Sequence, residues 1–283
     1  MKPRINRYSQ CSFGRRLGAT TLIAGLAGLA SATSVAAVEK AETPSVSGTL
    51  NLSGNTHFVS YGQDIWGVGN DWGENSPVFN PSIELSLDLG KGWSGILGTW
   101  WDVNNNADSS IGNAIQEVDV WAGLSYGVEK WSFTLLYQDW MYAEQSERIV
   151  DFIVAYDHWL NPSLTLHARV DNDIPAAEID GVDQDFDNGL AVVLGIAPGK
   201  ELGPVALSFP LKVAFDTDGY HAGDAGFSFA SAGVNASIPL SFITKGDWTF
   251  STGLIFYYTN DDVIPTNPDD AFITANAGVS LSF

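Results

Sequence analysis

Apolar and polar residues alternate with a period of two along most of the chain after residue 37. The alternation is cleanest near residue 209, where one face carries Val205, Leu207, Phe209, Leu211, Val213 and Phe215. The opposite face carries Ala206, Ser208, Pro210, Lys212, Ala214 and Asp216, and the pattern returns over residues 271–283. Stretches of about ten residues with this pattern, separated by turn residues, are typical of β-strands that span a membrane.

About twelve such stretches occur, at residues 47–60, 80–89, 93–103, 115–127, 131–141, 148–158, 163–171, 189–197, 204–215, 227–241, 248–259 and 271–283. No stretch after residue 37 holds 18 consecutive apolar residues, which excludes a transmembrane helix there. Because lipid cannot hydrogen-bond the edge of a sheet, spanning strands must close on themselves. The sequence therefore predicts an all-β fold, a closed antiparallel transmembrane β-barrel of about twelve strands with up-and-down topology over residues 47–283.

The links between the predicted strands alternate in length. Short links fall at residues 90–92, 128–130, 159–162, 198–203 and 242–247, and longer ones at 61–79, 104–114, 172–188, 216–226 and 260–270. Only the link at 142–147 is short where a long one is expected. Because bacterial outer-membrane barrels have short periplasmic turns and long outer loops, the alternation predicts an outer-membrane location and the orientation of the chain.

Basic and aromatic residues gather at the short links. Lys91, Lys130, Lys200 and Lys245 lie in these links, and Trp93, Trp131, Trp159 and Trp248 lie in or directly after four of them. Aromatic rings favour the membrane–water interface because they are half apolar and half polar. The four tryptophans predict a periplasmic aromatic girdle, with tryptophans that fill an ordinary β core as the alternative.

The first 37 residues have the order of a secretory signal peptide. Five basic residues, Lys2, Arg4, Arg7, Arg15 and Arg16, precede an apolar core and then small residues that end at Ala37. An N-terminal anchor helix is the alternative, but the apolar core is shorter than the roughly 20 residues that a spanning helix needs. We therefore predict an exported chain, cleavage after Ala37 and a short periplasmic segment at residues 38–46.

The charge of the chain limits the classes of molecule that it is expected to bind. Loss of the signal would leave eight basic residues against 33 acidic ones, a formal charge of −25. A chain this acidic is not expected to bind nucleic acid, which requires basic patches. The single cysteine, Cys11, would leave with the signal, so we expect neither a disulfide nor thiol chemistry.

The polar half of each alternation assigns a set of charged residues to the barrel lumen. This set comprises Glu84, Asp88, Asp102, Glu117, Asp119, Asp151, Asp157, His167, Arg169 and Lys212. Opposite charges across a water-filled constriction orient polar solutes, and a net negative lining favours cations. The pattern favours a passive channel for small hydrophilic solutes with a mild preference for cations. The alternative is a structural or adhesive barrel whose lumen is plugged by paired charges.

The long loops are acidic, and Asp183, Asp185 and Asp187 alternate within one of them. Carboxylates at this spacing are weak Ca²⁺ candidates, although Gly189 falls one place late for an EF-hand loop. A solvated acidic loop is the favoured interpretation, and no cofactor is expected.

An enzyme in the barrel wall is the main alternative from another class. Enzymes that act on membrane lipids place histidine and serine together on the lipid side. The histidines here, His57, His158, His167 and His221, stand in no recognisable arrangement with serine and an acid. We therefore expect no enzymatic activity, with a lipid-modifying enzyme as the less favoured alternative.

Two segments carry a resemblance to a known family. They are NTHFVSYGQDIWG at residues 55–67 and QEVDVWAGLSYGVEKWSFTLLYQDWMY at residues 116–142, which include Glu117, Val118 and Asp119. Over about a third of its length the chain resembles the TorF-type porin family of small proteobacterial outer-membrane β-barrels. The resemblance implies an outer-membrane porin and names no solute.

The end of the chain suggests further partners. The terminal Phe283 is similar to the C-terminal aromatic residue that the barrel-assembly machinery recognises. The expected partners are therefore this machinery, outer-membrane lipid and small hydrophilic solutes. A homo-oligomer remains open.

Overall fold

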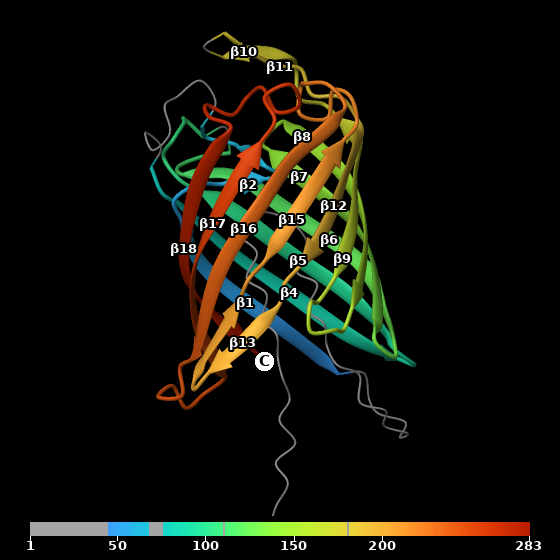
Figure 1. Ribbon diagram of the computed structural model, residues 1–283, viewed down its shortest axis with the longest axis vertical. Helices are drawn as coiled ribbons and strands as arrows, with labels where there is room; N and C mark the ends of the chain where they lie inside the picture. The colour runs from blue at the N-terminus through green and yellow to red at the C-terminus, as the bar shows by residue number, and fades with distance from the viewer. Residues whose placement is uncertain (1–44, 68–75, 110, 180) are drawn as a thin grey trace, which may run out of the picture.

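The computed structural model describes residues 45–67, 76–109, 111–179 and 181–283. The predicted signal peptide and nearly all of the predicted segment 38–46 lie outside these residues. The described chain forms a single barrel of tilted antiparallel strands, with a small two-stranded hairpin above one end (Figure 1). No helix long and apolar enough to cross a membrane occurs in these parts of the chain.

Twelve strands form the wall, one of them in two pieces. They are β1 (Val46–Asn55), β4 (Val78–Gly90), β5 (Trp93–Val103), β6 (Ile115–Val128), β7 (Trp131–Tyr142), β8 (Gln145–Tyr156), β9 (Ser163–Asn172), β12 (Gly189–Ile196), β14 (Val205–Ser208) with β15 (Leu211–Asp216), β16 (Gly226–Pro239), β17 (Asp247–Thr259) and β18 (Ala271–Ser282). Each pairs with its neighbours, and β1 pairs with β18 from Thr49↔Ser282 to Asn55↔Asn276. This ring confirms the predicted closed antiparallel barrel.

The ninth wall strand, predicted as continuous over 204–215, is interrupted at Phe209 and Pro210. Its halves β14 and β15 both pair with β16. Proline has no N–H to donate to a ladder, which explains the break. Phe209 instead donates its N–H to the Pro198 carbonyl at 2.9 Å. The link predicted at 198–203 contains a further short strand, β13 (Gly199–Leu202), which forms a hairpin with β14.

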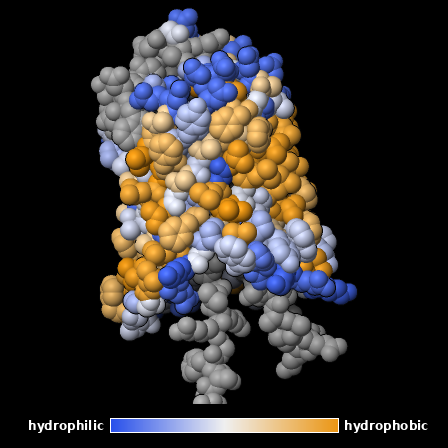
Figure 2. All heavy atoms as spheres, viewed as in Figure 1, coloured by the Kyte–Doolittle hydropathy of each residue, from blue (hydrophilic) through white to orange (hydrophobic). Residues whose placement is uncertain are grey.

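Large apolar side chains cover the outside of the barrel. Figure 2 shows them across the middle of the face in view, with hydrophilic residues above them and along parts of the lower rim. Exposed members of this apolar surface include Leu87, Leu97, Val120, Leu124, Leu135, Phe152, Leu194, Phe215, Leu254, Phe256 and Ile273. Leu97 is 58 % exposed although it lies in the middle of a strand. An apolar surface this extensive suits contact with lipid and not with water.

The links differ between the two ends, as the sequence predicts. Two-residue turns join β4 to β5 and β6 to β7, and Lys91 and Glu129 adopt positive φ angles of 54° and 53° there. The one short link at the other end consists of Ala143 and Glu144, between β7 and β8. The loop between β9 and β12 carries the hairpin of β10 (Ala177–Ile179) and β11 (Val182–Gln184), which stands above the barrel in Figure 1.

The first predicted strand, 47–60, is too long, because β1 ends at Asn55. Directly after β1, Thr56 forms two hydrogen bonds with Ala275 of β18. The Thr56 N–H donates to the Ala275 carbonyl and the Ala275 N–H donates to Thr56 Oγ1, both at 2.9 Å. The chain then turns into the barrel. Residues 57–64 are all buried, and they include the short strands β2 (Val59–Ser60) and β3 (Gln63–Asp64). We call residues 56–67 the inner segment.

A tight contact between β6 and β7 gives a test of the strand register. A Cβ atom on Gly123 would lie 2.1 Å from the Leu135 carbonyl oxygen, whereas one on Gly54 would meet nothing closer than 3.9 Å. Gly123→Ala should therefore cost about 1–3 kcal/mol through overpacking. We expect a lower urea midpoint for the refolded Gly123→Ala barrel and an unchanged one for Gly54→Ala. Equal midpoints would contradict this register.

Candidate functional site

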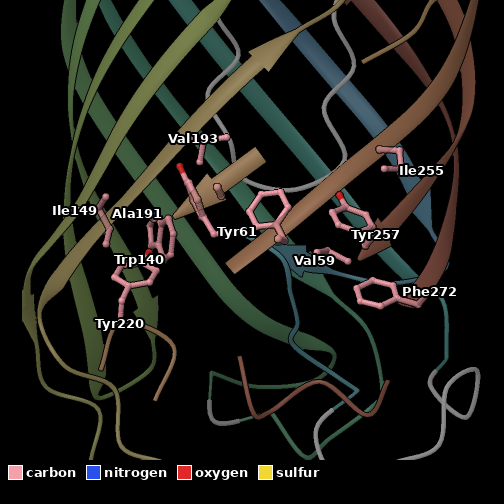
Figure 3. Close-up of a cluster of buried hydrophobic side chains, with 12 residues drawn as sticks. Val59, Tyr61, Trp140, Ile149, Ala191, Val193, Tyr220, Ile255, Tyr257 and Phe272 are labelled. Carbon is pink, nitrogen blue, oxygen red and sulfur yellow. The ribbon is translucent and has the colours of Figure 1, made fainter. Parts of the chain in front are cut away.

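The inner segment lies across the lumen near the end that carries the long loops. Figure 3 shows Tyr61 between a group formed by Trp140, Ile149 and Ala191 and a group formed by Ile255, Tyr257 and Phe272. These side chains belong to one buried cluster, to which Val59 also belongs. The Tyr61 ring stacks on the His167 ring with centroids 3.7 Å apart. An apolar core therefore fills the lumen at this level.

Backbone and amide hydrogen bonds fasten the inner segment to the loop between β17 and β18. Gln63 Nε2 donates to Thr266 Oγ1 at 2.9 Å, and the Asp64 N–H donates to Asn267 Oδ1 at 2.8 Å. Asn267 Nδ2 in turn donates to the Gly62 carbonyl at 2.9 Å. Because buried backbone groups need such partners, these bonds make a folded position inside the barrel possible.

The fit of the inner segment depends on glycine at one turn. Gly62 has a φ of +95°, and a Cβ atom there would lie 2.6 Å from the Phe229 ring. A residue with a side chain would be strained by its backbone and would clash with the barrel wall.

Five carboxylates face the inner segment from one side of the barrel. This acidic wall consists of Asp102 on β5, Glu117 and Asp119 on β6, and Glu147 and Asp151 on β8, all of them buried. Asp102 accepts hydrogen bonds from Asn80 Nδ2 at 3.1 Å, from Asn104 Nδ2 at 2.8 Å and from Trp66 Nε1 of the inner segment at 2.9 Å. The acidic wall thus binds the inner segment as well as lining the lumen.

Two of these carboxylates have cationic or ionisable partners. The Arg169 guanidinium pairs with Glu147, which also accepts a hydrogen bond from the Tyr142 hydroxyl at 3.0 Å. Asp151 lies 2.5 Å from His167 Nδ1 and accepts a bond from Gln138 Nε2 at 2.6 Å. Glu117 and Asp119 form no ion pair with any basic residue that the structure describes. The wall therefore holds more acidic side chains than basic ones.

Arg169 also connects the acidic wall to the outer loops. Its Nη1 donates to the Tyr220 carbonyl at 2.7 Å and to the Asp187 carbonyl at 3.1 Å, and its guanidinium lies 4.3 Å from the Tyr220 ring centroid. Tyr220 is buried, and its neighbour His221 contacts Asp216 at 2.8 Å. Parts of three loops, around residues 61, 220 and 264, therefore close this end of the barrel.

Most of the residues assigned to the lumen from the sequence face inward. Asp102, Glu117, Asp119, Asp151, His167 and Arg169 come together around the inner segment. Glu84 faces inward nearer the other end, where it accepts a hydrogen bond from Trp121 Nε1 at 3.1 Å, and Lys212 faces inward from β15. Whether these residues line a conducting pore stays a prediction.

Two of the residues that the sequence assigned to the lumen lie outside it. Asp157 is exposed, and its N–H donates to the Lys130 carbonyl. The assignment to the lumen is wrong because β8 ends at Tyr156, two residues before the predicted end, so Asp157 lies outside the strand. Asp88 is exposed at the mouth of the barrel, where its Oδ1 accepts the Gly90 N–H at 2.8 Å and closes a turn.

Sequence reasoning missed Glu147 and the inner segment. Glu147 was assigned to a link, but it alternates with Ile149 and Asp151, and this spacing of two is a signal that identifies it as inward. The signal in the inner segment is weaker: Phe58, Val59 and Tyr61 are apolar residues in a stretch that the pattern divides between a strand and an outer loop.

The half of the lumen nearer the short links, which is predicted to face the periplasm, differs from the filled half. Its inward positions carry mainly small or hydrogen-bonding side chains, including Asn51, Ser86, Ser94, Ser125, Thr134, Ser163, Thr165, Ser231, Ser251 and Ser280. Side chains of this size and polarity leave room for water.

The other predicted sites can be placed, although their roles stay predictions. Trp93, Trp131 and Trp159 are exposed at the short-link end, and Trp248 there donates to the Lys245 carbonyl at 3.0 Å. The Phe283 N–H and carbonyl bond to Gly48, so the terminal residue extends the β18–β1 ladder. Asp185 and Asp187 are exposed, and the Asp183 side chain lies outside the described part. The described residues contain no group of three histidine, cysteine or acidic side chains placed to hold a metal ion.

Comparisons with solved structures find other membrane barrels. The NanC porin is 9 % identical with a TM-score of 0.45 over 83 % of this chain and 100 % of that chain. The translocator domain of the autotransporter NalP from Neisseria meningitidis is 10 % identical with a TM-score of 0.44 over 87 % and 90 %. An anion-selective porin from Comamonas acidovorans is 11 % identical with a TM-score of 0.32 over 85 % and 99 %. No family model and no curated protein matches the chain.

Asp64 makes the position of the inner segment depend on pH. Burial, the largest effect, raises the pKa of Asp64 to about 7, although the N–H groups of Trp66 and Gly67 lower it. An aspartate in water titrates near 3.9, so the buried form holds an extra proton between about pH 4 and 7. The buried position is therefore favoured at low pH and weakens as pH rises through this window. Burial lowers the pKa of the neighbouring His57.

Thiol labelling measures this effect, because the mature chain as predicted contains no cysteine. We expect Ser60→Cys, at a buried position, to react slowly at pH 5 and faster at pH 8, relative to Thr56→Cys at an exposed position. Asp64→Asn should remove the change in this ratio. A ratio that stays pH-dependent in the Asp64→Asn background would show that another group controls the segment.

Proposed function

We propose that this chain is an outer-membrane conduit for small hydrophilic solutes, with a mild preference for cations, and that the inner segment closes it in the described form. The observation that carries the proposal is the acidic wall, five buried carboxylates that face the lumen beside one paired arginine. Net negative charge in a narrow passage raises the local concentration of cations. The resemblance to TorF-type porins supports the same function.

The two halves of the lumen support a passage that opens and closes. The periplasmic half has small polar side chains, which a barrel that serves only as scaffold does not require. In the filled half, the inner segment occupies the centre of a cluster whose other side chains come mostly from the wall strands. Movement of residues 56–67 would therefore open a path without a change in the strands.

A plugged structural barrel is the second candidate, and the fit of the inner segment favours it. Gly62 packs on Phe229, and Tyr61 stacks on His167 in the centre of the cluster. A segment held this tightly can serve to fill and stabilise the barrel. An enzyme stays the less favoured alternative, because the histidines stand in no recognisable arrangement with serine and an acid in the sequence, and we propose no catalytic role.

Removal of the inner segment distinguishes a conduit from a plugged barrel. In a variant with residues 57–66 replaced by a short Gly-Ser linker, we expect single-channel conductance in a planar bilayer to rise several-fold over the intact chain. Wild-type silence with a conducting variant would identify the segment as a resting closure. Silence from a variant that folds would overturn the conduit and leave the structural barrel.

Ion selectivity, measured in the variant that lacks residues 57–66, tests the role of the acidic wall. Neutralising Asp102, Glu117 and Asp151 as Asp102→Asn, Glu117→Gln and Asp151→Asn should move the KCl reversal potential towards zero, because the lining loses its excess negative charge. The control removes the same number of charges from the exposed loop residues Asp261, Asp262 and Asp269. Equal reversal potentials in the two triple variants would contradict a role for the wall in selectivity.

A further inference from the structure

The inward positions directly below the filled layer form a separate region of the lumen. On each strand this region lies two to four residues nearer the short-link end than the filled layer. These positions are Trp121, Leu136 and Ile153 on β6 to β8, and Gly195, Lys212 and Gly253 on β12, β15 and β17. In the ring of strands, β15 to β17 stand opposite β5 to β7. Two walls of different chemistry therefore face each other.

One of these walls is apolar. Trp121, Leu136 and Ile153 form a buried cluster against which Ile96 and Trp100 pack. The Trp121 indole lies flat on the barrel wall, since a Cβ atom on Gly98 would lie 2.3 Å from its ring. A flat indole and two aliphatic side chains suit contact with an apolar group.

The opposite wall carries an unpaired cation. Lys212 follows the exposed Leu211 and shares a face of β15 with the fully buried Ala214, two residues further on. Its side chain therefore lies on the lumen side. No carboxylate that the structure describes lies within ion-pair distance of it, whereas Arg169, the other inward cation of the described strands, pairs with Glu147. Its neighbours across the strand pairs, Gly195 and Ser231, are small. A partly buried ammonium without an anion is costly, so the site is suited to receive one.

Two buried donors on the same side also lack a protein partner. Asn276 is 7 % exposed and Ser251 is 2 % exposed, and within the described residues neither Asn276 Nδ2 nor Ser251 Oγ has a hydrogen-bond partner. Both lie opposite glycines in the β17–β18 ladder, Asn276 opposite Gly253 and Ser251 opposite Gly278. Buried donors are normally satisfied, so these groups indicate an acceptor supplied by a bound molecule or water.

We propose that this region binds a small organic anion with an apolar body, such as an aromatic or short aliphatic carboxylate. The carboxylate contacts Lys212, and the body lies against Trp121, Leu136 and Ile153. The inference goes beyond the proposed conduit, because binding below the inner segment does not require passage through it. A binding experiment therefore fails or succeeds independently of conductance.

The probe is 4-fluorobenzoate, followed by fluorine NMR line broadening with the refolded barrel in nanodiscs, and 4-fluorobenzyl alcohol is its uncharged counterpart. We expect saturable broadening of the carboxylate with the wild type. The affinity should fall about tenfold or more in Lys212→Met, since a bond to a charged group is lost. The matched control is Lys245→Met, which removes the same charge from an exposed turn, and Lys212→Arg should restore binding.

Two further results decide the proposal. Ile153→Thr, which shortens the apolar wall but keeps the branched side chain, should weaken both fluorinated probes to a similar extent. Equal binding of the carboxylate to Lys212→Met and Lys245→Met, both checked for folding by urea unfolding, would overturn the assignment of the anion to Lys212. Equal affinity of wild type for the carboxylate and the alcohol would overturn the anionic ligand class.

Discussion

Closure of the ring between β1 and β18 is the constraint on which the rest of this structure depends. A strand edge inside lipid would leave a row of N–H and C=O groups without partners, each at a cost of several kcal/mol. The pairing from Thr49↔Ser282 to Asn55↔Asn276, extended by Phe283 and Gly48, removes that edge. Once the ring is closed, every second side chain must face lipid and the others must face an interior that lipid never reaches. The sorting of the whole sequence follows from this geometry.

Twelve strands enclose more space than their inward side chains fill, so the interior needs further contents. The two ends of the barrel are filled differently. Near the short links the inward side chains are small and polar, and water suits them. Near the long loops the inner segment enters and builds an apolar core around Tyr61. The carboxylates at that level are buried with it, and Asp102 is stabilised by three donors, one of them Trp66 of the segment itself.

The same geometry explains what the sequence can and cannot predict. A period of two encodes the direction of each side chain, so the number of strands, their order and the inward position of residues such as Asp119 and His167 follow from the pattern. Pro210 breaks a strand for a reason visible in the sequence, the missing N–H. The path of the inner segment is not encoded in this way. Phe58, Val59 and Tyr61 are apolar in either a strand or a core, and only the partners at residues 266 and 267, some 200 positions away, decide between them.

In the proposed conduit, closure and selectivity are not separate properties of the lumen. Asp102 bonds Trp66, and the Asp151–His167 pair lies under Tyr61, so the groups that give the proposed path its charge also hold the segment that closes it. A change that weakens the negative wall therefore also removes contacts of the segment. Below this level the coupling ends, because Lys212 contacts no part of the acidic wall and stands across the lumen from an apolar surface. A solute bound there as proposed would meet a different chemistry from one that passed the acidic wall, so the proposed conduit would distinguish the two by their depth in the lumen.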